Sequence, residues 1–157
     1  MAARSDFSIE NAKIKFHNFA GKERKFNPAG KRVITLDLAE HPELVEDLTR
    51  DGWNIKYLQP LDEDGEPTPI LDVEIKYSEK ARPPKVVVIT DRSKTEIGEE
   101  SISMLDYADI RNVDIVVRPY NYNVQGREGV KAYLKAIYVT IAEDKFDEKY
   151  ADLPFND

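Results

Sequence analysis

The 157-residue sequence predicts a mostly β fold, in which a small five-stranded barrel carries short inserted helices and an extended C-terminal β-hairpin. Short runs rich in β-branched and aromatic residues recur along the chain, and turn residues separate them. No helical run is long enough to supply the several crossover helices that a βαβ stack needs. The residues are 41% hydrophobic and 34% charged, which is typical of a globular protein with its own core.

We expect one domain over residues 1–142 and a flexible acidic tail over residues 143–157. The net charge of −7 argues against a polyanionic partner, but the charge is unevenly distributed. Residues 1–32 hold eight Lys and Arg against three acids, a net of +5, whereas the tail holds six acids against two Lys, a net of −4. This distribution weakens the objection to an anionic partner.

Two absences narrow the functional classes. The chain has no Cys, which excludes disulfides, thiolate zinc sites and cysteine nucleophiles. It has no run of 18 apolar residues and no charged-then-apolar leader. We therefore expect a cytoplasmic protein without a membrane partner.

The first predicted strand spans residues 9–16. Strand alternation puts Ile14 and Phe16 on one face and Lys13 and Lys15 on the other. The strand leads into a basic segment.

Residues 17–32 are predicted to form a long loop, because Gly21, Pro28 and Gly30 interrupt regular structure. Loops longer than about 12 residues in a compact domain are usually functional or disordered. The cations of this loop are Lys22, Arg24, Lys25, Lys31 and Arg32, with Phe19 and Phe26 among them. The alternative is a solvated loop whose two Phe cover the edge of the core.

Residues 32–38 are predicted to form a strand with Ile34, Leu36 and Leu38 inward. A short helix follows over residues 39–51, since Pro42 suits its first turn and Gly52 ends it.

Three more elements precede the hairpin. Strands are predicted at 53–58 and 70–77, separated by an exposed acidic turn, and a buried strand is predicted at 86–90. Residues 99–107 favour a short helix with Ile102 and Leu105 inward.

The C-terminal hairpin is predicted to pair strands near 112–122 and 130–141 around a turn at Gly126 to Gly129. One face is apolar, with Val113, Ile115 and Val117 from the first strand. The apolar residues of the return strand are Val130, Ala132, Leu134 and Ala136.

The opposite face of the hairpin interleaves rings and charges, namely Asp114, Val116, Arg118, Tyr120 and Tyr122 with Lys131, Tyr133 and Lys135. Aromatic faces stack on unpaired bases, and nearby cations neutralise the backbone between them. This face therefore suits a single-stranded nucleic acid. The alternative is that the tyrosines only pack as half-buried strand residues.

Signals of catalysis are few. The two histidines, His17 and His41, lack metal-ligand spacing, and no GxSxG or phosphate-binding glycine pattern occurs. The carboxylates Asp37, Asp72, Glu74 and Asp114 leave a two-metal nuclease site open as an alternative. We expect no catalytic residue, metal or cofactor.

The arrangement of short strands, two short helices and long loops fits the OB-fold best. Five stretches also carry a family resemblance: FHNFAGKERKFN (16–27), DGWNIKYL (51–58), ARPPKVVVIT (81–90), NVDIVVRPY (112–120) and GVKAYLKAIYVTI (129–141). Through them, residues 8–142 resemble the single-stranded DNA-binding proteins of tailed bacteriophages, a family built on the OB-fold. The resemblance implies binding and protection of single-stranded DNA, with little sequence preference, during phage DNA replication, recombination or repair. An OB-like protein-interaction module is the alternative.

The tail resembles a second group. Acidic residues followed by ADLPF resemble the end of bacterial single-stranded DNA-binding proteins, which docks replication and repair enzymes. The resemblance implies a partner-binding role for Asp152, Leu153, Pro154 and Phe155, although Asn156 and Asp157 displace the terminal carboxylate from Phe155. The acidic tail is also a candidate to compete with DNA for a groove between the basic loop and the hairpin.

In the resulting hypothesis, the basic loop and the ring-bearing hairpin face flank one groove, in a monomer or homodimer. The predicted phosphate contacts are Lys22, Arg24, Lys25, Lys31, Arg32, Arg118, Lys131 and Lys135. The predicted stacking residues are Phe26, Trp53, Tyr57, Tyr120, Tyr122 and Tyr133. For Trp53 and Tyr57 the alternative is an inward orientation together with Ile55.

Overall fold

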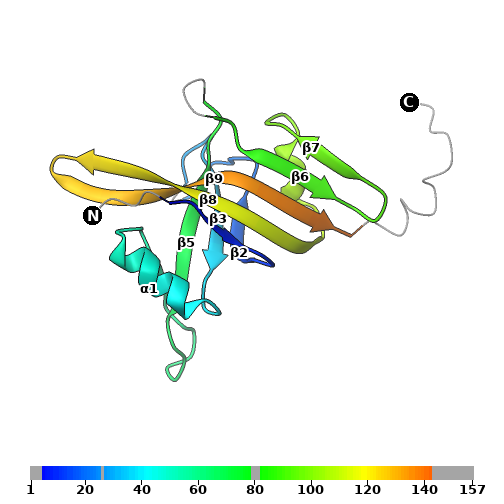
Figure 1. The fold of residues 1–157 in the computed structure, drawn as a ribbon. Helices are drawn as coiled ribbons and strands as arrows, with labels where there is room; N and C mark the ends of the chain where they lie inside the picture. The colour runs from blue at the N-terminus through cyan, green and yellow to red at the C-terminus, as the bar shows by residue number, and fades with distance from the viewer. Residues whose placement is uncertain (1–4, 26, 79–81, 143–157) are drawn as a thin grey trace, which may run out of the picture.

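A computed structural model describes residues 5–25, 27–78 and 82–142 (Figure 1). The predicted site residue Phe26 and the predicted partner-binding residues Asp152 to Phe155 lie outside the described residues.

The described chain is mostly β, as predicted. Its strands are β1 (Phe7–Ile9), β2 (Lys13–Asn18), β3 (Arg32–Asp37), β4 (Lys56–Leu58), β5 (Thr68–Ile75), β6 (Lys85–Ile89), β7 (Lys94–Ile97), β8 (Ile110–Val124) and β9 (Arg127–Ile141). Its helices are α1 (Pro42–Arg50) and a 3₁₀ helix, η1 (Ile102–Asp106).

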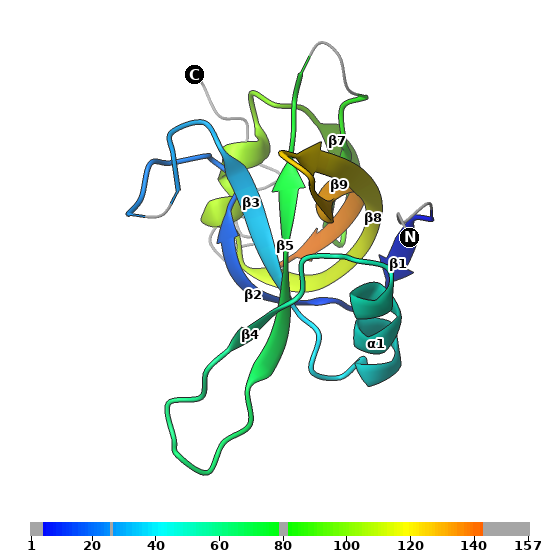
Figure 2. The same ribbon diagram turned by 90° about the vertical axis from the view of Figure 1, so that its left-hand side faces the viewer.

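The strands form one curved sheet in the order β1-β8-β9-β5-β3-β2 (Figure 2). β4 extends it beside β5, and β6 with β7 extends it beside β9. β9 pairs in parallel with both β5 and β6, so it lies at the centre of the sheet. The OB-fold-like class is confirmed, but the expectation of a closed barrel is wrong, because β1 and β2 do not pair within the described residues.

The β8–β9 hairpin extends well beyond the rest of the sheet (Figure 1). Its turn consists of Gln125 and Gly126, both at positive φ (52° and 80°), which matches the right-handed twist of the paired strands. The predicted turn at Gly126 to Gly129 is thus too long. Gly129 lies within β9, opposite Tyr122.

The core lies on the concave side of this sheet. As predicted, Ile34, Leu36 and Leu38 are fully buried. Ile102 and Leu105 of η1 are also buried completely and close one end of the core. Helix α1 begins at Pro42, and Gly52 follows it at φ 89°, as its predicted role as the stop requires.

Two local differences from the predicted strands have a physical cause. A turn with Asn11 at φ 52° separates β1 from β2, where one strand was expected. The register of β2 against β3 then shifts between Ile14 and Phe16, as in a β-bulge. Ile14 packs against the core, whereas Phe16 leaves the face that alternation predicts for both residues and is 54% exposed. The prediction that Ile14 and Phe16 share one face was therefore wrong.

The segment before the hairpin also differs from its predicted structure. Residues 94–97 form strand β7 on β6, and the helix expected at 99–107 is the shorter η1. In the part of the chain that the structure describes, no helix combines the length and the apolar character needed to cross a membrane.

Asp106, at the end of η1, fixes the start of the loop between β2 and β3. Its carboxylate accepts hydrogen bonds from the backbone N–H of Phe19 (2.8 Å) and of Ala20 (2.9 Å). His17 Nδ1 lies 2.8 Å from the same carboxylate, and the Asp106 side chain is only 8% exposed. A single carboxylate thus satisfies backbone donors that would otherwise be buried without acceptors.

Substituting Asp106 by Ala should lower the free energy of unfolding by about 2–4 kcal/mol, because two nearly buried N–H groups lose their acceptor. Urea denaturation measures this loss. Asp106→Asn is the matched control, because its amide oxygen still accepts one bond, and it should lose clearly less. Equal stability of wild type and Asp106→Ala would contradict the assigned role.

The same carboxylate predicts a pH dependence. Burial alone would raise the pKa of Asp106, but the hydrogen bonds from Phe19, His17 and Ala20 outweigh burial and hold the pKa below its ordinary value of 3.8. A depressed pKa stabilises the fold above the unfolded-state value and loses this contribution as pH falls through the folded-state value. The stability difference between wild type and Asp106→Asn should therefore be constant above about pH 5 and shrink below pH 3.8.

Candidate nucleic-acid interface

Strand alternation in the hairpin separates its core residues from its polar face. Val113, Ile115 and Val117 of β8 are buried, as predicted. Arg118, Tyr120 and Tyr122 consequently project from the opposite face, away from the core. Their cross-strand partners in β9 are Tyr133, Lys131 and Gly129 respectively. We call Arg118, Tyr120, Tyr122, Lys131 and Tyr133 the tyrosine face.

Rings and cations of the tyrosine face contact one another. The rings of Tyr120 and Tyr133 are stacked, with centroids 4.8 Å apart and planes at 18°. Tyr120 is 48% exposed and Tyr133 only 8%, so Tyr133 supports the ring of Tyr120 from below. The Arg118 guanidinium lies 5.7 Å from the Tyr133 ring centroid, and Lys131 Nζ lies 5.9 Å from that of Tyr122. Stacking on Tyr133 thus holds the Tyr120 ring in place through one face and leaves its other face open.

The Tyr133 phenol stays neutral. Burial raises its pKa, and the neighbouring charges of Lys76 and Arg118 oppose that rise without reversing it. Lys76 Nζ also lies 5.9 Å from the Tyr133 ring centroid. The ring is therefore flanked by two cations and carries no charge of its own.

Gly129 makes room for the Tyr122 ring. A Cβ atom at Gly129 would lie 2.3 Å from Tyr122 Oη and 2.5 Å from Cζ, closer than any real contact. The ring therefore lies across β9 at the position of the missing side chain. Tyr122 Oη also approaches Asn54 Oδ1 at 3.5 Å, the limit of a hydrogen bond.

A groove of about 190 Å³ runs beside the tyrosine face. It is lined by Lys31, Val33, Asn54, Lys56, Asp72, Glu74, Lys131 and Ala132. Lys31 comes from the basic loop and Lys131 from the hairpin, so the fold brings together two segments that are far apart in sequence. The two acids in the groove are paired: Asp72 with Lys56 at 3.0 Å and Glu74 with Lys76 at 3.7 Å.

The basic loop between β2 and β3 is held at its base by two Asn side chains. Asn18 exchanges hydrogen bonds with the backbone of Lys22, and Asn27 donates to the carbonyl groups of Lys22, Pro28 and Lys31. The exposed cations are Lys22, Arg24, Lys25 and Lys31. The loop is thus anchored at its base while its charges face solvent.

Two loop cations already have aromatic partners. Lys22 Nζ lies 5.0 Å from the Tyr107 ring centroid and is hydrogen-bonded to its hydroxyl. Arg32 is paired with Glu99 at 3.2 Å, and its guanidinium lies 5.6 Å from the Tyr77 ring centroid. Phe19 is fully buried, which agrees with the alternative that it covers the core.

Three of the described site residues predicted from the sequence belong to neither the tyrosine face, the groove nor the basic loop. Trp53 is 5% exposed and packs edge-on against Phe7, with ring centroids 5.1 Å apart, so the inward alternative holds and its ring offers no face to a base. Tyr57 is 53% exposed but lies next to Lys56, which faces the groove, so alternation turns it away. Lys135 pairs with Asp6 at 2.7 Å in a separate hollow.

Two residues that line the groove, Asn54 and Lys56, were not among the site residues predicted from the sequence. The sequence did not show which face each residue of WNIKYL occupies. This stretch was expected to form one strand, and only its aromatic residues were candidates for DNA contact. Only Lys56–Leu58 is strand, and Trp53 instead bridges to Val130 of the hairpin.

The acids weighed for a metal site have other roles. Asp37 Oδ1 accepts from the backbone N–H of Ala39, and Asp114 Oδ1 accepts from that of Asn11. Among the described residues, no three His, Cys, Asp or Glu side chains are grouped so that they could hold a metal ion.

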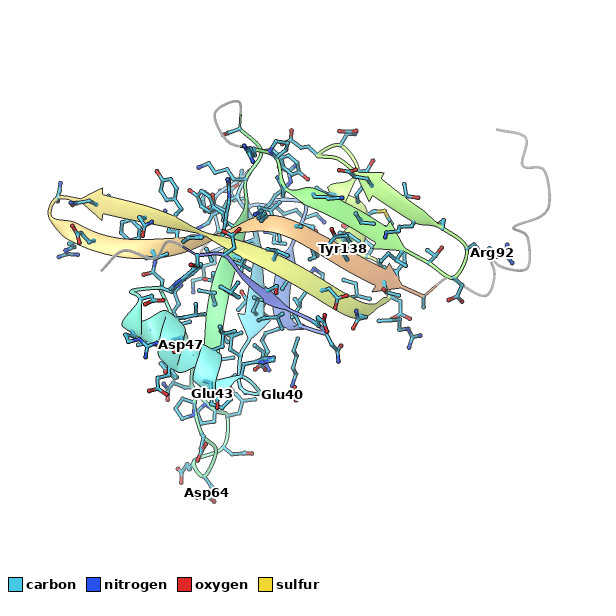
Figure 3. All side chains as sticks on the ribbon, in the orientation of Figure 1. Glu40, Glu43, Asp47, Asp64, Arg92 and Tyr138 are labelled. Atoms are coloured by element: carbon cyan, nitrogen blue, oxygen red, sulfur yellow. The ribbon has the colours of Figure 1, made fainter. Side chains whose placement is uncertain are left out.

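Other acids gather around α1. Figure 3 shows Glu40, Glu43 and Asp47 on and beside this helix, and Asp64 in the loop between β4 and β5 beyond it. Much of the negative charge thus lies on elements other than the hairpin and the basic loop.

Comparisons with solved structures support the fold. The single-stranded DNA-binding protein of bacteriophage Enc34, in complex with single-stranded DNA, matches with a TM-score of 0.56 at 13% identity, over 90% of this chain and 89% of that chain. A second structure of that protein matches with a TM-score of 0.55 at 14% identity, over 94% of this chain and 88% of that chain. At these identities the likeness shows a shared fold.

A comparison with curated proteins gives no match. The family model of the phage ssDNA-binding domain, in contrast, matches residues 2–157. This match confirms the resemblance of residues 8–142 to the single-stranded DNA-binding proteins of bacteriophages. The chain therefore belongs to the family of phage single-stranded DNA-binding domains.

Proposed function

We propose that the tyrosine face and the adjoining groove bind single-stranded DNA with little sequence preference. The observation that carries this proposal is the stacked pair of Tyr120 and Tyr133, in which a supported ring leaves one face open beside Arg118 and Lys131. Ring faces stack on any base, so such a site discriminates little between sequences.

Stacking also explains a preference for single strands. In a duplex both faces of each base are covered by neighbouring base pairs, so a tyrosine cannot stack without unstacking the DNA. In a single strand the bases turn to the rings, and the phosphates remain available to cations. Lys31, Lys56 and Lys131 line the groove beside the rings and are the proposed phosphate contacts there. Lys22, Arg24 and Lys25 of the basic loop extend the proposed path.

The biological role follows from binding alone. Covering exposed strands protects them during phage DNA replication, recombination or repair, in the cytoplasm of the host cell. The proposed role is stoichiometric, and catalysis is not part of it. The acidic tail is the proposed contact for replication or recombination proteins, through Asp152, Leu153, Pro154 and Phe155.

Wild-type protein should bind oligo-dT much more tightly than duplex DNA of the same length. Affinity should fall with salt, with a log–log slope of roughly 0.7 per phosphate neutralised. Gel shift and fluorescence anisotropy at several salt concentrations measure both. Equal affinity for the duplex, or an affinity independent of salt, would contradict the proposal.

Substituting Tyr120 and Tyr133 together by Ala should weaken binding of oligo-dT by about 1–3 kcal/mol for each base that loses its ring. Tyr120→Phe is the matched control, because it keeps the ring and removes only an exposed hydroxyl, and it should bind like wild type. Thermal melting checks that the double variant is folded. If the folded double variant binds as tightly as wild type, the rings do not stack on bases.

Deleting residues 143–157 should tighten DNA binding, most clearly at low salt, because the acids of the tail then no longer compete for the cations. Deleting only Asn156 and Asp157 is the control, since it keeps five of the six tail acids. Anisotropy titrations of all three proteins at low and high salt provide the measurement. Unchanged affinity of the long deletion would rule out the competition.

A further inference from the structure

A β-bulge lies at the inner end of the tyrosine face. Val116 pairs with Ala136, but the next residue, Val117, pairs with Leu134, which leaves Lys135 as the extra residue of β9. A bulge redirects the side chain of the residue it inserts. Lys135 is therefore directed into a hollow next to Arg118, and not along the tyrosine face.

This hollow has a volume of about 390 Å³ and is lined by four chain segments, namely the residues before β1, those before β6, and strands β8 and β9. Its lining residues are Asp6, Arg82, Pro83, Arg118, Leu134 and Lys135. Asp6 precedes β1, and Arg82 precedes β6. Three cations thus surround one carboxylate, so the hollow has an excess of positive charge.

Two of the cations have unused hydrogen-bonding capacity. Arg118 Nε is buried and has no hydrogen-bond partner within the described residues, although its guanidinium lies against the Tyr133 ring. Arg82 is exposed, and the described part of the chain provides no ion-pair partner for it. A buried donor without an acceptor is costly, and guanidinium groups are well suited to phosphate oxygens.

Asp6 occupies the position that an anion would take. Its Oδ2 atom accepts a hydrogen bond from Lys135 Nζ at 2.7 Å. The side chains are 36% and 57% exposed, so the pair is hydrated and weak. A backbone phosphodiester carries the same single negative charge as Asp6, and its non-bridging oxygens suit the guanidinium groups of Arg82 and Arg118 as well as Lys135, so it is able to replace the carboxylate.

We propose that this hollow is a phosphate site for bound single-stranded DNA, formed by Arg82, Arg118 and Lys135, and that Asp6 is the internal anion which the phosphate displaces. The inference rests on the proposed function. Because Arg118 contacts the ring of Tyr133, the site adjoins the stacked pair. A strand that stacks on Tyr120 therefore continues into the hollow.

The test measures oligo-dT affinity against salt for wild type, Arg82→Ala and Arg92→Ala. Arg92→Ala is the matched control, since it removes the same charge at the turn between β6 and β7, at the end of the molecule opposite the hairpin tip (Figure 3). Arg82→Ala should reduce the log–log salt slope by roughly 0.7, the value of one phosphate contact on a single strand, and Arg92→Ala should not. Arg82 is exposed, so the fold should tolerate its loss.

The variant Asp6→Asn should change the affinity in the opposite direction, because it removes the internal anion. It frees Lys135 for a phosphate and should tighten binding at low salt, whereas a merely structural ion pair would leave affinity unchanged or weaken it. Equal salt slopes for Arg82→Ala and Arg92→Ala, or no gain in affinity for Asp6→Asn, would overturn the phosphate site. The proposed function would still stand in that case, provided that the wild-type protein binds oligo-dT. No binding of oligo-dT by wild type would overturn both.

Discussion

The register between β8 and β9 is the constraint on which the rest of the structure depends. It places Val113 opposite Val139 and Ile115 opposite Ile137, and all four side chains are buried. Successive side chains of a strand point to opposite faces, so the same register turns every second residue outward in the half of the hairpin near its tip. A slip by one residue would bury the tyrosines and expose the valines, at the cost of the core. The packing of the interior thus decides where the rings lie.

Much of this was predictable from local patterns. The alternation in the hairpin, the inward Ile34, Leu36 and Leu38 in and directly after β3, and the end of α1 before Gly52 all follow from short-range rules. The start of α1 does not, because the helix begins at Pro42 and not at the predicted residue 39. The errors arise where distant pairing decides. Phe16 turns outward because β2 bulges against β3, and Trp53 turns inward because it bridges to Val130. Neither event is visible in a local pattern.

In the candidate site, too, local patterns predict some residues, and long-range pairing decides the others. The residues of the tyrosine face were found from alternation alone. A groove between the basic loop and the hairpin was also predicted, with Lys31 and Lys131 beside it. Lys56 was not, because it joins them only through the pairing of β4 with β5, which itself lies between β3 and β9. The hollow at Lys135 depends on a bulge and on the parallel pairing of β6 with β9, which sequence patterns do not reveal. Long-range strand order, more than residue type, therefore limited the prediction.

The most direct test of the central claim is photo-cross-linking of a 5-iododeoxyuridine oligonucleotide to the intact protein, followed by peptide mapping. Such cross-links form preferentially with aromatic rings stacked on the modified base. We predict cross-links at Tyr120 or Tyr122 on the tyrosine face. Cross-links confined to Tyr57 or Tyr138 would contradict this claim, because neither ring belongs to the tyrosine face.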